Sequence, residues 1–411
     1  MLSQKTIDIV KSTAPVLEEH GEALTRHFYQ RMFNHNPEVK PFFNPANQAQ
    51  GAQQRALANA ICAYAANIDR LDRLGSAVEL IAHKHASLMV KPEHYPIVGE
   101  NLLASIREVL GPGATDEIIA AWSEAYNALA DILIQRESQI YDHNASRPGG
   151  WNGFRPFRVE QKVPESEIVT SFYLKPADER PAPSFLPGQY ITIQMATPDG
   201  STTMRNYSLS CQPGLESLRI SVKRESRQDS HSPEGFVSNQ LHDAVQVGDT
   251  LQAGPPCGEF VLESGAATQR PLVLLAGGIG ITPLLSMLNT AVETTPTRPI
   301  VLIYACRNPR VQAFREHLDQ LAHNHEPLTV HYRYSDEDAD PTPAHSSTGL
   351  VDATLIDALM PTRDADYYVC GPKPFMQSII QTLGEWQIPP AQVRSEFFGP
   401  QQALHPAIQE A

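Results

Sequence analysis

The chain has 411 residues and a formal net charge of −14, and its five cysteines are scattered without a CxxC pair. Its length predicts roughly two to four domains, and its acidic balance argues against a surface for nucleic acid or anionic membranes. The cysteine pattern argues against a disulfide framework or a cysteine zinc site, and the lack of a signal segment or a membrane-length apolar run predicts a soluble, cytoplasmic protein.

Residues 1–147 read as a series of helices, because alanine, leucine and glutamate are common and clusters of β-branched residues are few. We expect Ser3 to cap the first helix. Breaks at "NHNPEVKPFFNP", "LDRLG", "KPEHYP" and "LGPGATD" leave helices of ordinary length. This part of the chain is therefore predicted to form an all-α domain.

The stretch "HKHASLMVKPEHY", residues 83–95, draws attention because it holds three histidines. One apolar helix face is formed by Leu74, Val78, Ile81, His85 and Leu88. His85 should therefore point into apolar surroundings, whereas Glu79, His83 and Lys84 are expected in solvent. Pro92 should end the helix, since the residue before a proline avoids helical geometry. From this stretch alone, His85 is either a core histidine bonded to a carbonyl or a metal ligand.

The rest of the chain changes character twice. Between Phe157 and Leu262, short β-rich runs such as "IVTSFYL" and "QYITIQM" alternate with Pro, Gly and Asp turns, which predicts a small antiparallel barrel. From Arg270 onward, apolar runs such as "PLVLLAGG" alternate with helical patterns, which predicts a parallel sheet covered on both faces. The segment "DEDADPTPAHSST" is the most loop-like part of the chain.

Two motifs in these regions suit nucleotide chemistry. "LLAGGIGITP" reads as a strand, a glycine turn and a helix start, where the backbone can approach a pyrophosphate; it is otherwise a plain strand-to-helix turn. In "MRNYSLS", Arg205 suits a phosphate, Tyr207 suits a flat ring, and Ser208 suits a ring nitrogen or oxygen, although Tyr207 equally fits strand packing.

Six motifs in order ("PGQY", "RNYS", "EGFVSNQLH", "GGIGITP", "CGP" and "EFFGP") resemble the ferredoxin–NADP reductase-like flavin reductases over roughly residues 155–405. The resemblance implies FAD across a six-stranded barrel, with Arg205 and the Ser238 region near its pyrophosphate. Asn206 stands where relatives often have glutamine, which we expect to alter little. The implied flavin contacts are Tyr190, Arg205, Asn206, Tyr207, Ser208, Ser238, Phe397, Phe398, Gly399 and Pro400. The implied nicotinamide-nucleotide contacts are Gly278, Ile279, Gly280, Ile281, Thr282, Pro283, Cys370, Gly371 and Pro372.

The N-terminal region resembles a globin, and with "PGGW" (148–151) at the junction the whole chain is similar to the flavohaemoglobin (nitric oxide dioxygenase) family. The residues that carry the globin resemblance are Phe28, Tyr29, Phe43, Gln53, His85, Tyr95 and Glu137. It implies a haem-binding globin domain at 1–147, an FAD-binding barrel at 152–263 and an NAD(P)H-binding domain at 269–411.

The same resemblance implies roles around a b-type haem. His85 would ligate the iron, and Glu137 with Tyr95 would hold its other ring nitrogen. Glu137 reads equally well, from its local sequence, as a solvated helix charge. On the other face Tyr29 would donate a hydrogen bond to dioxygen. The remaining pocket residues are Phe43, which would wedge the porphyrin, Gln53 and Leu57. Lys84 and Glu396 match positions that tune cofactor potentials, or are surface charges.

The implied activity is that of a nitric oxide dioxygenase: NAD(P)H reduces FAD, FAD reduces the haem iron, and haem-bound dioxygen converts nitric oxide to nitrate. One alternative is a flavohaem reductase for oxygen, quinones, ferric iron or lipid hydroperoxides. The other is an oxygen or nitric oxide sensor, against which the attached reductase argues. The sequence leaves open NADH or NADPH, where Arg307 has no decisive partner, and a lipid in the distal pocket by Leu57. We expect small-molecule partners and a monomer.

Overall fold

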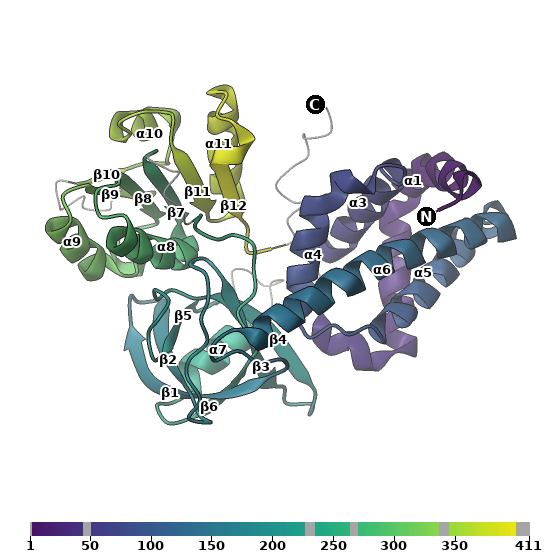
Figure 1. Cartoon of the computed structure of the whole chain (residues 1–411), viewed down its shortest axis with the longest axis horizontal. Coiled ribbons are helices and arrows are strands. Elements are labelled where there is room, and N and C mark those ends of the chain that lie inside the picture. Colours follow the sequence, from purple (N-terminus) through teal and green to yellow (C-terminus); the bar gives the residue numbers. More distant parts are fainter. Residues whose placement is uncertain (1, 44–50, 227–234, 264–269, 337–344, 400–411) are drawn as a thin grey trace.

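The computed structural model describes residues 2–43, 51–226, 235–263, 270–336 and 345–399. They form a helical domain, an antiparallel barrel and an α/β domain, which meet at a common junction (Figure 1). This confirms the predicted combination of three architectures. No helix in the described ranges is long and apolar enough to cross a membrane.

The helical domain packs its helices around one apolar core. Its elements are α1 (Gln4–His35), η1 (Pro37–Phe42), α3 (Ala52–Ala66), η2 (Leu71–Leu74), α4 (Gly75–Ser87), α5 (His94–Leu110), η3 (Gly111–Gly113) and α6 (Asp116–Ser146). The side chain of Ser3 accepts a hydrogen bond from the Thr6 N–H, so the predicted cap of the first helix is confirmed.

The end of α4 differs from our expectation, because the helix ends at Ser87 and not at Pro92. Met89 adopts a left-handed conformation with φ 62°. The Val90 N–H bonds to the His85 carbonyl and the Met89 N–H bonds to the Ala86 carbonyl, both at 3.0–3.2 Å. These two bonds form a Schellman motif, here with methionine where glycine is usual.

The barrel holds six antiparallel strands within the described residues, in the order β4-β3-β6-β1-β2-β5. They are β1 (Arg155–Pro164), β2 (Val169–Pro176), β3 (Tyr190–Ala196), β4 (Thr202–Ser208), β5 (Leu218–Lys223) and β6 (Thr250–Ala253), with α7 (Phe236–Asp243) against β4 and β5. A bridge between Leu209 and Ile220 joins the two ends of this order. The predicted small barrel is confirmed.

The α/β domain has a parallel sheet in the order β10-β9-β8-β7-β11-β12. The strands are β7 (Leu272–Gly277), β8 (Ile300–Cys306), β9 (Leu328–Tyr334), β10 (Ser346–Thr348), β11 (Asp366–Cys370) and β12 (Val393–Glu396). Between them lie η4 (Gly278–Gly280), α8 (Ile281–Thr294), η5 (Pro309–Val311), α9 (Arg315–Asn324), α10 (Ala353–Leu359), α11 (Lys373–Glu385) and η6 (Pro390–Gln392). Separate apolar cores lie on the two faces, as predicted. The strand order reverses between β7 and β11, which is where such sheets bind nucleotides. Residues 337–344, most of the segment read as loop-like, lie outside the described residues.

Arg155 forms hydrogen bonds that hold the segment between the helical domain and the barrel in place. Its side chain is only 2 % exposed and bonds to both carboxylate oxygens of Asp178 and to the Gly149 carbonyl. The guanidinium also lies 5.3 Å from the centre of the Trp151 ring. Because a Cβ on Gly150 would stand 2.0 Å from the Asn144 carbonyl oxygen, the turn after α6 has room only for glycine there. The end of α6 is therefore held tightly against the barrel (Figure 1).

Candidate functional site

Three helices of the N-terminal domain bring His85, Tyr95 and Glu137 together. The Nδ1 of His85 lies 2.7 Å from Glu137 Oε1 and 3.1 Å from the Tyr95 hydroxyl. Tyr95 donates to the same Glu137 oxygen at 2.5 Å, and burial and this carboxylate raise the pKa of Tyr95. Glu137 is 2 % exposed, so its reading as a solvated charge is wrong.

This arrangement fits an iron porphyrin. A carboxylate at Nδ1 requires the ring proton there, which leaves the Nε2 lone pair to bind a metal. The described residues hold no group of three or more His, Cys, Asp or Glu side chains that could hold a metal ion. A single histidine held in this way suits haem iron, because the porphyrin supplies most of the other ligands.

Tyr29 on α1 lies among aromatic side chains. It is 6 % exposed, and its ring meets those of Phe28 and Phe43 edge-on at centroid distances of 5.0 and 5.6 Å. Burial raises the pKa of Tyr29, so its hydroxyl stays protonated and able to donate. Gln53 and Leu57 lie near the start of α3, which packs on α1, and Leu57 joins the same apolar core as Phe43. These predicted pocket residues thus share one region.

The barrel residues expected at the flavin lie on β4 and the adjoining α7. The Arg205 guanidinium is half-buried and donates to the Met204 carbonyl at 2.6 Å. Tyr207 packs against the barrel core, and Ser208 is buried. Ser238 stands in the first turn of α7, where its hydroxyl donates to the Gly235 carbonyl and accepts from the Glu225 N–H. A cationic side chain on a strand next to a helix suits a pyrophosphate.

Tyr190 and Asn206 lie at the contact with the helical domain. Tyr190 is buried in an apolar cluster that also contains Ala82 and Tyr95. Asn206 accepts a bond from the Thr192 hydroxyl at 2.8 Å, and its amide nitrogen lies 3.5 Å from the Ser87 hydroxyl on α4. Asn206 is therefore also a contact between domains, which its sequence context did not indicate.

The two glycine motifs of the α/β domain meet where the strand order reverses. A Cβ on Gly280 would lie 2.2 Å from the Cys370 carbonyl oxygen, and one on Gly277 would lie 2.7 Å from Pro372 Cδ. Gly278 has φ +53°, a conformation that favours glycine. Ile279 lies between these glycines, and the first residues of α8, Ile281, Thr282 and Pro283, are buried. The backbones of residues 277–283 and 370–372, Gly371 included, thus form one wall, as a pyrophosphate site requires.

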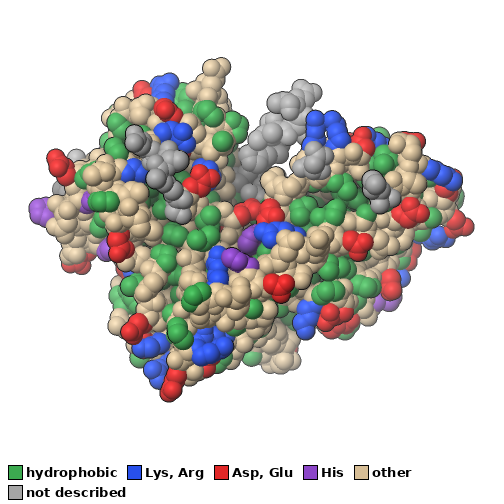
Figure 2. Space-filling model, viewed as in Figure 1, with side chains coloured by type: hydrophobic (Ala, Val, Ile, Leu, Met, Phe, Trp, Pro, Cys, Tyr) green, Lys and Arg blue, Asp and Glu red, His purple; other side chains and the backbone are tan. Residues whose placement is uncertain are grey.

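Lys84 and Glu396 influence each other across domains. Burial lowers the pKa of Lys84, while Glu396 raises it; burial raises the pKa of Glu396 to about 8. Glu396 Oε2 is buried without a hydrogen-bond partner in the described part of the chain. The expectation that Lys84 is solvated is therefore wrong. Charged and histidine side chains gather where the domains meet (Figure 2).

Of the C-terminal aromatic segment, Phe397 packs on the core of the α/β domain, whereas Phe398 is 47 % exposed. A Cβ on Gly399 would meet the Phe397 ring at 2.5 Å. Pro400 lies outside the described residues.

His83 was also expected in solvent, but its side chain is only 17 % exposed. Its Nδ1 accepts a hydrogen bond from the Gly258 N–H of the barrel at 3.3 Å. Sequence reasoning missed this contact. The four-residue spacing of His83 and Ser87 puts both on one side of α4, but it does not indicate that the barrel covers that side.

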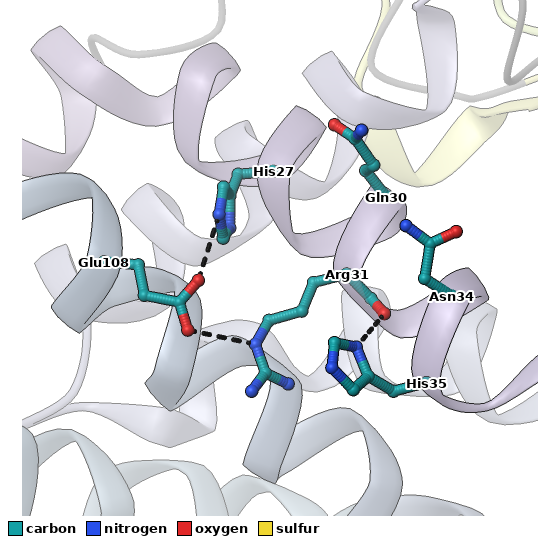
Figure 3. A pocket seen from close by; sticks show the side chains of 6 residues that line it. All are labelled: His27, Gln30, Arg31, Asn34, His35 and Glu108. Atoms are coloured by element: carbon teal, nitrogen blue, oxygen red, sulfur yellow. Dashed lines mark hydrogen bonds and ion pairs between the residues drawn. The ribbon is translucent and has the colours of Figure 1, made fainter.

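A separate hollow of about 320 Å³ lies on the helical domain, away from these groups. It is lined by His27, Gln30, Arg31, Asn34, His35 and Glu108 (Figure 3). Glu108 lies 3.2 Å from both His27 and Arg31. The charged side chains that line the hollow therefore already contact one another.

Three family models match successive parts of the chain: Globin at residues 26–133, Oxidoreductase FAD-binding domain at 156–262 and Oxidoreductase NAD-binding domain at 274–381. A flavohemoprotein from Rhodopirellula baltica is 51 % identical over 410 residues, covering 98 % of this chain and 99 % of that protein. One from Bordetella pertussis is 48 % identical over 403 residues, covering 97 % and 99 %.

Solved structures give the same result. A flavohemoglobin from Malassezia yamatoensis with bound FAD and heme superposes with TM-score 0.82 at 28 % identity, covering 97 % of this chain and 100 % of that one. The FAD/NAD-binding domain of a nitric oxide dioxygenase from Vibrio cholerae covers 60 % of this chain and 99 % of its own, with TM-score 0.54 and 33 % identity. With the three domains in this order and such relatives along nearly its whole length, the chain belongs to the flavohaemoprotein family and is an NAD(P)H-dependent oxidoreductase with haem and FAD as cofactors.

Proposed function

We propose that the protein is a nitric oxide dioxygenase, which combines two nitric oxide and two dioxygen molecules with one NAD(P)H to give two nitrate ions, NAD(P)⁺ and one proton. When bound, haem would supply oxygen binding and one-electron chemistry, and FAD would supply the conversion of a two-electron hydride into single electrons. Similarity to the FAD/NAD-binding domain of the Vibrio cholerae nitric oxide dioxygenase supports this activity.

The buried contact between Glu137 and His85 carries the proposal. A carboxylate 2.7 Å from Nδ1 gives the imidazole partial anionic character, which stabilises oxidised iron and favours oxygen chemistry over reversible storage. Because Tyr95 donates to the same carboxylate oxygen, the pair is held in one orientation. A carbonyl partner at Nδ1 would lack this charge.

On the other side of the domain, we propose that Tyr29 donates a hydrogen bond to the bound diatomic substrate. Its side chain is 6 % exposed, and its ring packs among the aromatic side chains of this core. The ring of Phe43 and the side chain of Leu57 would contact the porphyrin edge, with Gln53 at the pocket rim. Tyr29 would thus orient the substrate, while Glu137 would act through His85 on the electron density at the iron.

The test is the nitrate yield of the purified, cofactor-loaded protein with NADH or NADPH, dioxygen and nitric oxide. Two nitrate ions for each NAD(P)H support the proposal. Oxidation of NAD(P)H without nitrate would identify a reductase with another acceptor. Nitric oxide binding without NAD(P)H consumption would identify a sensor.

A further inference from the structure

One side of α4 contacts the barrel, while His85 projects toward Glu137. His83 and Ser87 lie one helical turn apart on that side and reach the Gly258 N–H and the Asn206 side chain. The side chain of Met89, just after the helix, lies 3.0 Å from the point where Gly254 would carry a Cβ. The helix with the proximal histidine therefore rests directly on the flavin-binding domain.

The ring of His83 is held from the helical domain as well. Because Nδ1 accepts from Gly258, its proton must be on Nε2, which lies 4.0 Å from Glu79 Oε2. Glu79 in turn forms two bonds, of 2.6 and 2.9 Å, with Arg136 on α6. His83 and His85 thus each face a carboxylate, but with opposite ring nitrogens.

The hydrogen bond from Gly258 leads to a residue expected at the flavin. Gly258 has φ +114°, and a Cβ there would lie 3.0 Å from Tyr190 Cε1, so only glycine lets this backbone lie flat on the Tyr190 ring. The neighbouring Cys257 exchanges two backbone hydrogen bonds of 2.9 Å with Tyr190. A side chain that holds Gly258 therefore holds Tyr190.

We propose that His83 is a positioning residue for electron transfer, which fixes the flavin-contacting wall formed by Gly258 and Tyr190 against the helix that carries His85. It binds neither cofactor. It keeps the separation between the flavin and haem sites short and constant, so that its loss slows the passage of electrons between them and leaves hydride transfer to the flavin unchanged. The inference rests on the flavin-to-haem transfer that the proposed function requires, not on nitric oxide as the substrate.

The experiment compares His83→Leu, which loses the acceptor, with His83→Asn, whose amide oxygen occupies nearly the position of Nδ1. Haem and FAD content are measured first, from the absorption spectrum. The proteins are then mixed anaerobically with NADH and carbon monoxide in a stopped-flow instrument, which follows flavin bleaching and formation of the ferrous carbonyl haem at separate wavelengths. His35→Leu, an exposed histidine of the outer hollow (Figure 3), is the matched control.

We expect His83→Leu to reduce its haem roughly ten- to a hundredfold more slowly, since small displacements of reacting groups have effects of this size. Flavin bleaching should be unchanged, and both His83→Asn and His35→Leu should behave as the original protein. If His83→Leu does not fold, His83→Gln replaces it, because its amide extends past the Nδ1 position.

Unchanged haem reduction in His83→Leu would overturn the proposal. So would equal slowing of flavin and haem, or a His83→Asn variant as slow as His83→Leu, since both indicate general damage. The stopped-flow experiment does not depend on nitrate formation. If the separate nitrate assay fails while the His83 variants show the expected pattern, the dioxygenase activity is refuted and the role of His83 stands.

Discussion

The His85 site and the glycine turn of the α/β domain are built in opposite ways. His85, Tyr95 and Glu137 come from three helices, with Tyr95 and Glu137 separated by 42 positions in the chain, and they meet through side-chain atoms. The turn at Gly277–Gly280 is continuous in sequence, and its critical contact with Cys370 joins backbone to backbone. A site made of side chains should respond to substitution by degrees, whereas a site made of close backbone contacts should fail outright.

Gly280→Ala provides the most severe test of this contrast. The new Cβ would stand 2.2 Å from the Cys370 carbonyl oxygen and 2.8 Å from the Gly371 nitrogen, and neither backbone atom has a flexible end that can move aside. We expect flavin reduction by NADH to fall about a hundredfold or more, with haem and FAD retained, as measured by anaerobic stopped-flow.

Gly384→Ala is the control for Gly280→Ala, because nothing lies within 4 Å of its Cβ position in α11. It should keep normal hydride transfer and gain roughly 0.5–1 kcal/mol of stability from the helix. A Gly280→Ala protein that is reduced at the normal rate would show that the two motifs move freely past each other.

Tyr29→Phe tests the graded response on the haem side. Removing one buried hydrogen bond to a partly charged oxygen costs on the order of 1.5–3 kcal/mol, or roughly ten- to a hundredfold. Oxygen should therefore dissociate from the ferrous protein faster by this factor in flash photolysis. Phe28→Leu, which changes the neighbouring ring without removing a hydroxyl, should not reproduce the effect, and an unchanged dissociation rate in Tyr29→Phe would remove Tyr29 from the site.

Glu137→Gln should have a smaller effect, because it keeps the shape of the proximal contact and removes only its charge. Oxidised iron loses stabilisation, so the haem midpoint potential should rise by roughly 60 mV, which is a tenfold change in a one-electron equilibrium. Spectroelectrochemical titration measures this shift. The flavin potential serves as the internal control, and a haem potential equal to that of the original protein would contradict the role given to Glu137.

Asp178→Asn should leave turnover almost unchanged and alter stability alone. Hydrogen bonds from Arg155 hold the pKa of Asp178 well below its usual range. The contribution of ionised Asp178 to the free energy of unfolding is therefore fully present above about pH 4, the ordinary aspartate pKa. It is lost as the pH falls through the depressed pKa of the folded protein. Since Asp178 is 27 % exposed, we expect a loss of about 1–2 kcal/mol at neutral pH.

Denaturant titration at neutral and at acid pH checks the Asp178→Asn prediction. The difference between variant and original protein should shrink toward low pH, because protonation of Asp178 removes the same charge. Asp131→Asn, which alters an exposed carboxylate on α6, is the control. An Asp178→Asn difference that grows with acidity would contradict the assigned sign.

The contrast between the two sites also explains what the sequence could predict. The glycine turn was recognisable because its motif is one run of consecutive residues, although its contact partner Cys370 lies far away in the chain. Glu137 was not recognisable from its local sequence, which fits a solvated charge equally well; the family resemblance indicated it, and the fold places it beside His85. Helical phase correctly put His83 and Lys84 on the side of α4 away from His85, but phase cannot say that another domain covers that side. The early end of α4 depended on Met89 in a left-handed conformation that glycine normally adopts.

The apolar cluster shared by α4, α6 and the barrel has a consequence for dividing the protein. Ala82, Ala86 and Leu133 of the helical domain are buried in the same cluster as Tyr190 and Cys257 of the barrel. A fragment that ends after α6 would expose this apolar surface to water, and exposed apolar surfaces drive self-association. The isolated helical domain should thus dimerise or aggregate more readily than the full-length chain, and ligand affinities measured on it would then describe an aggregate.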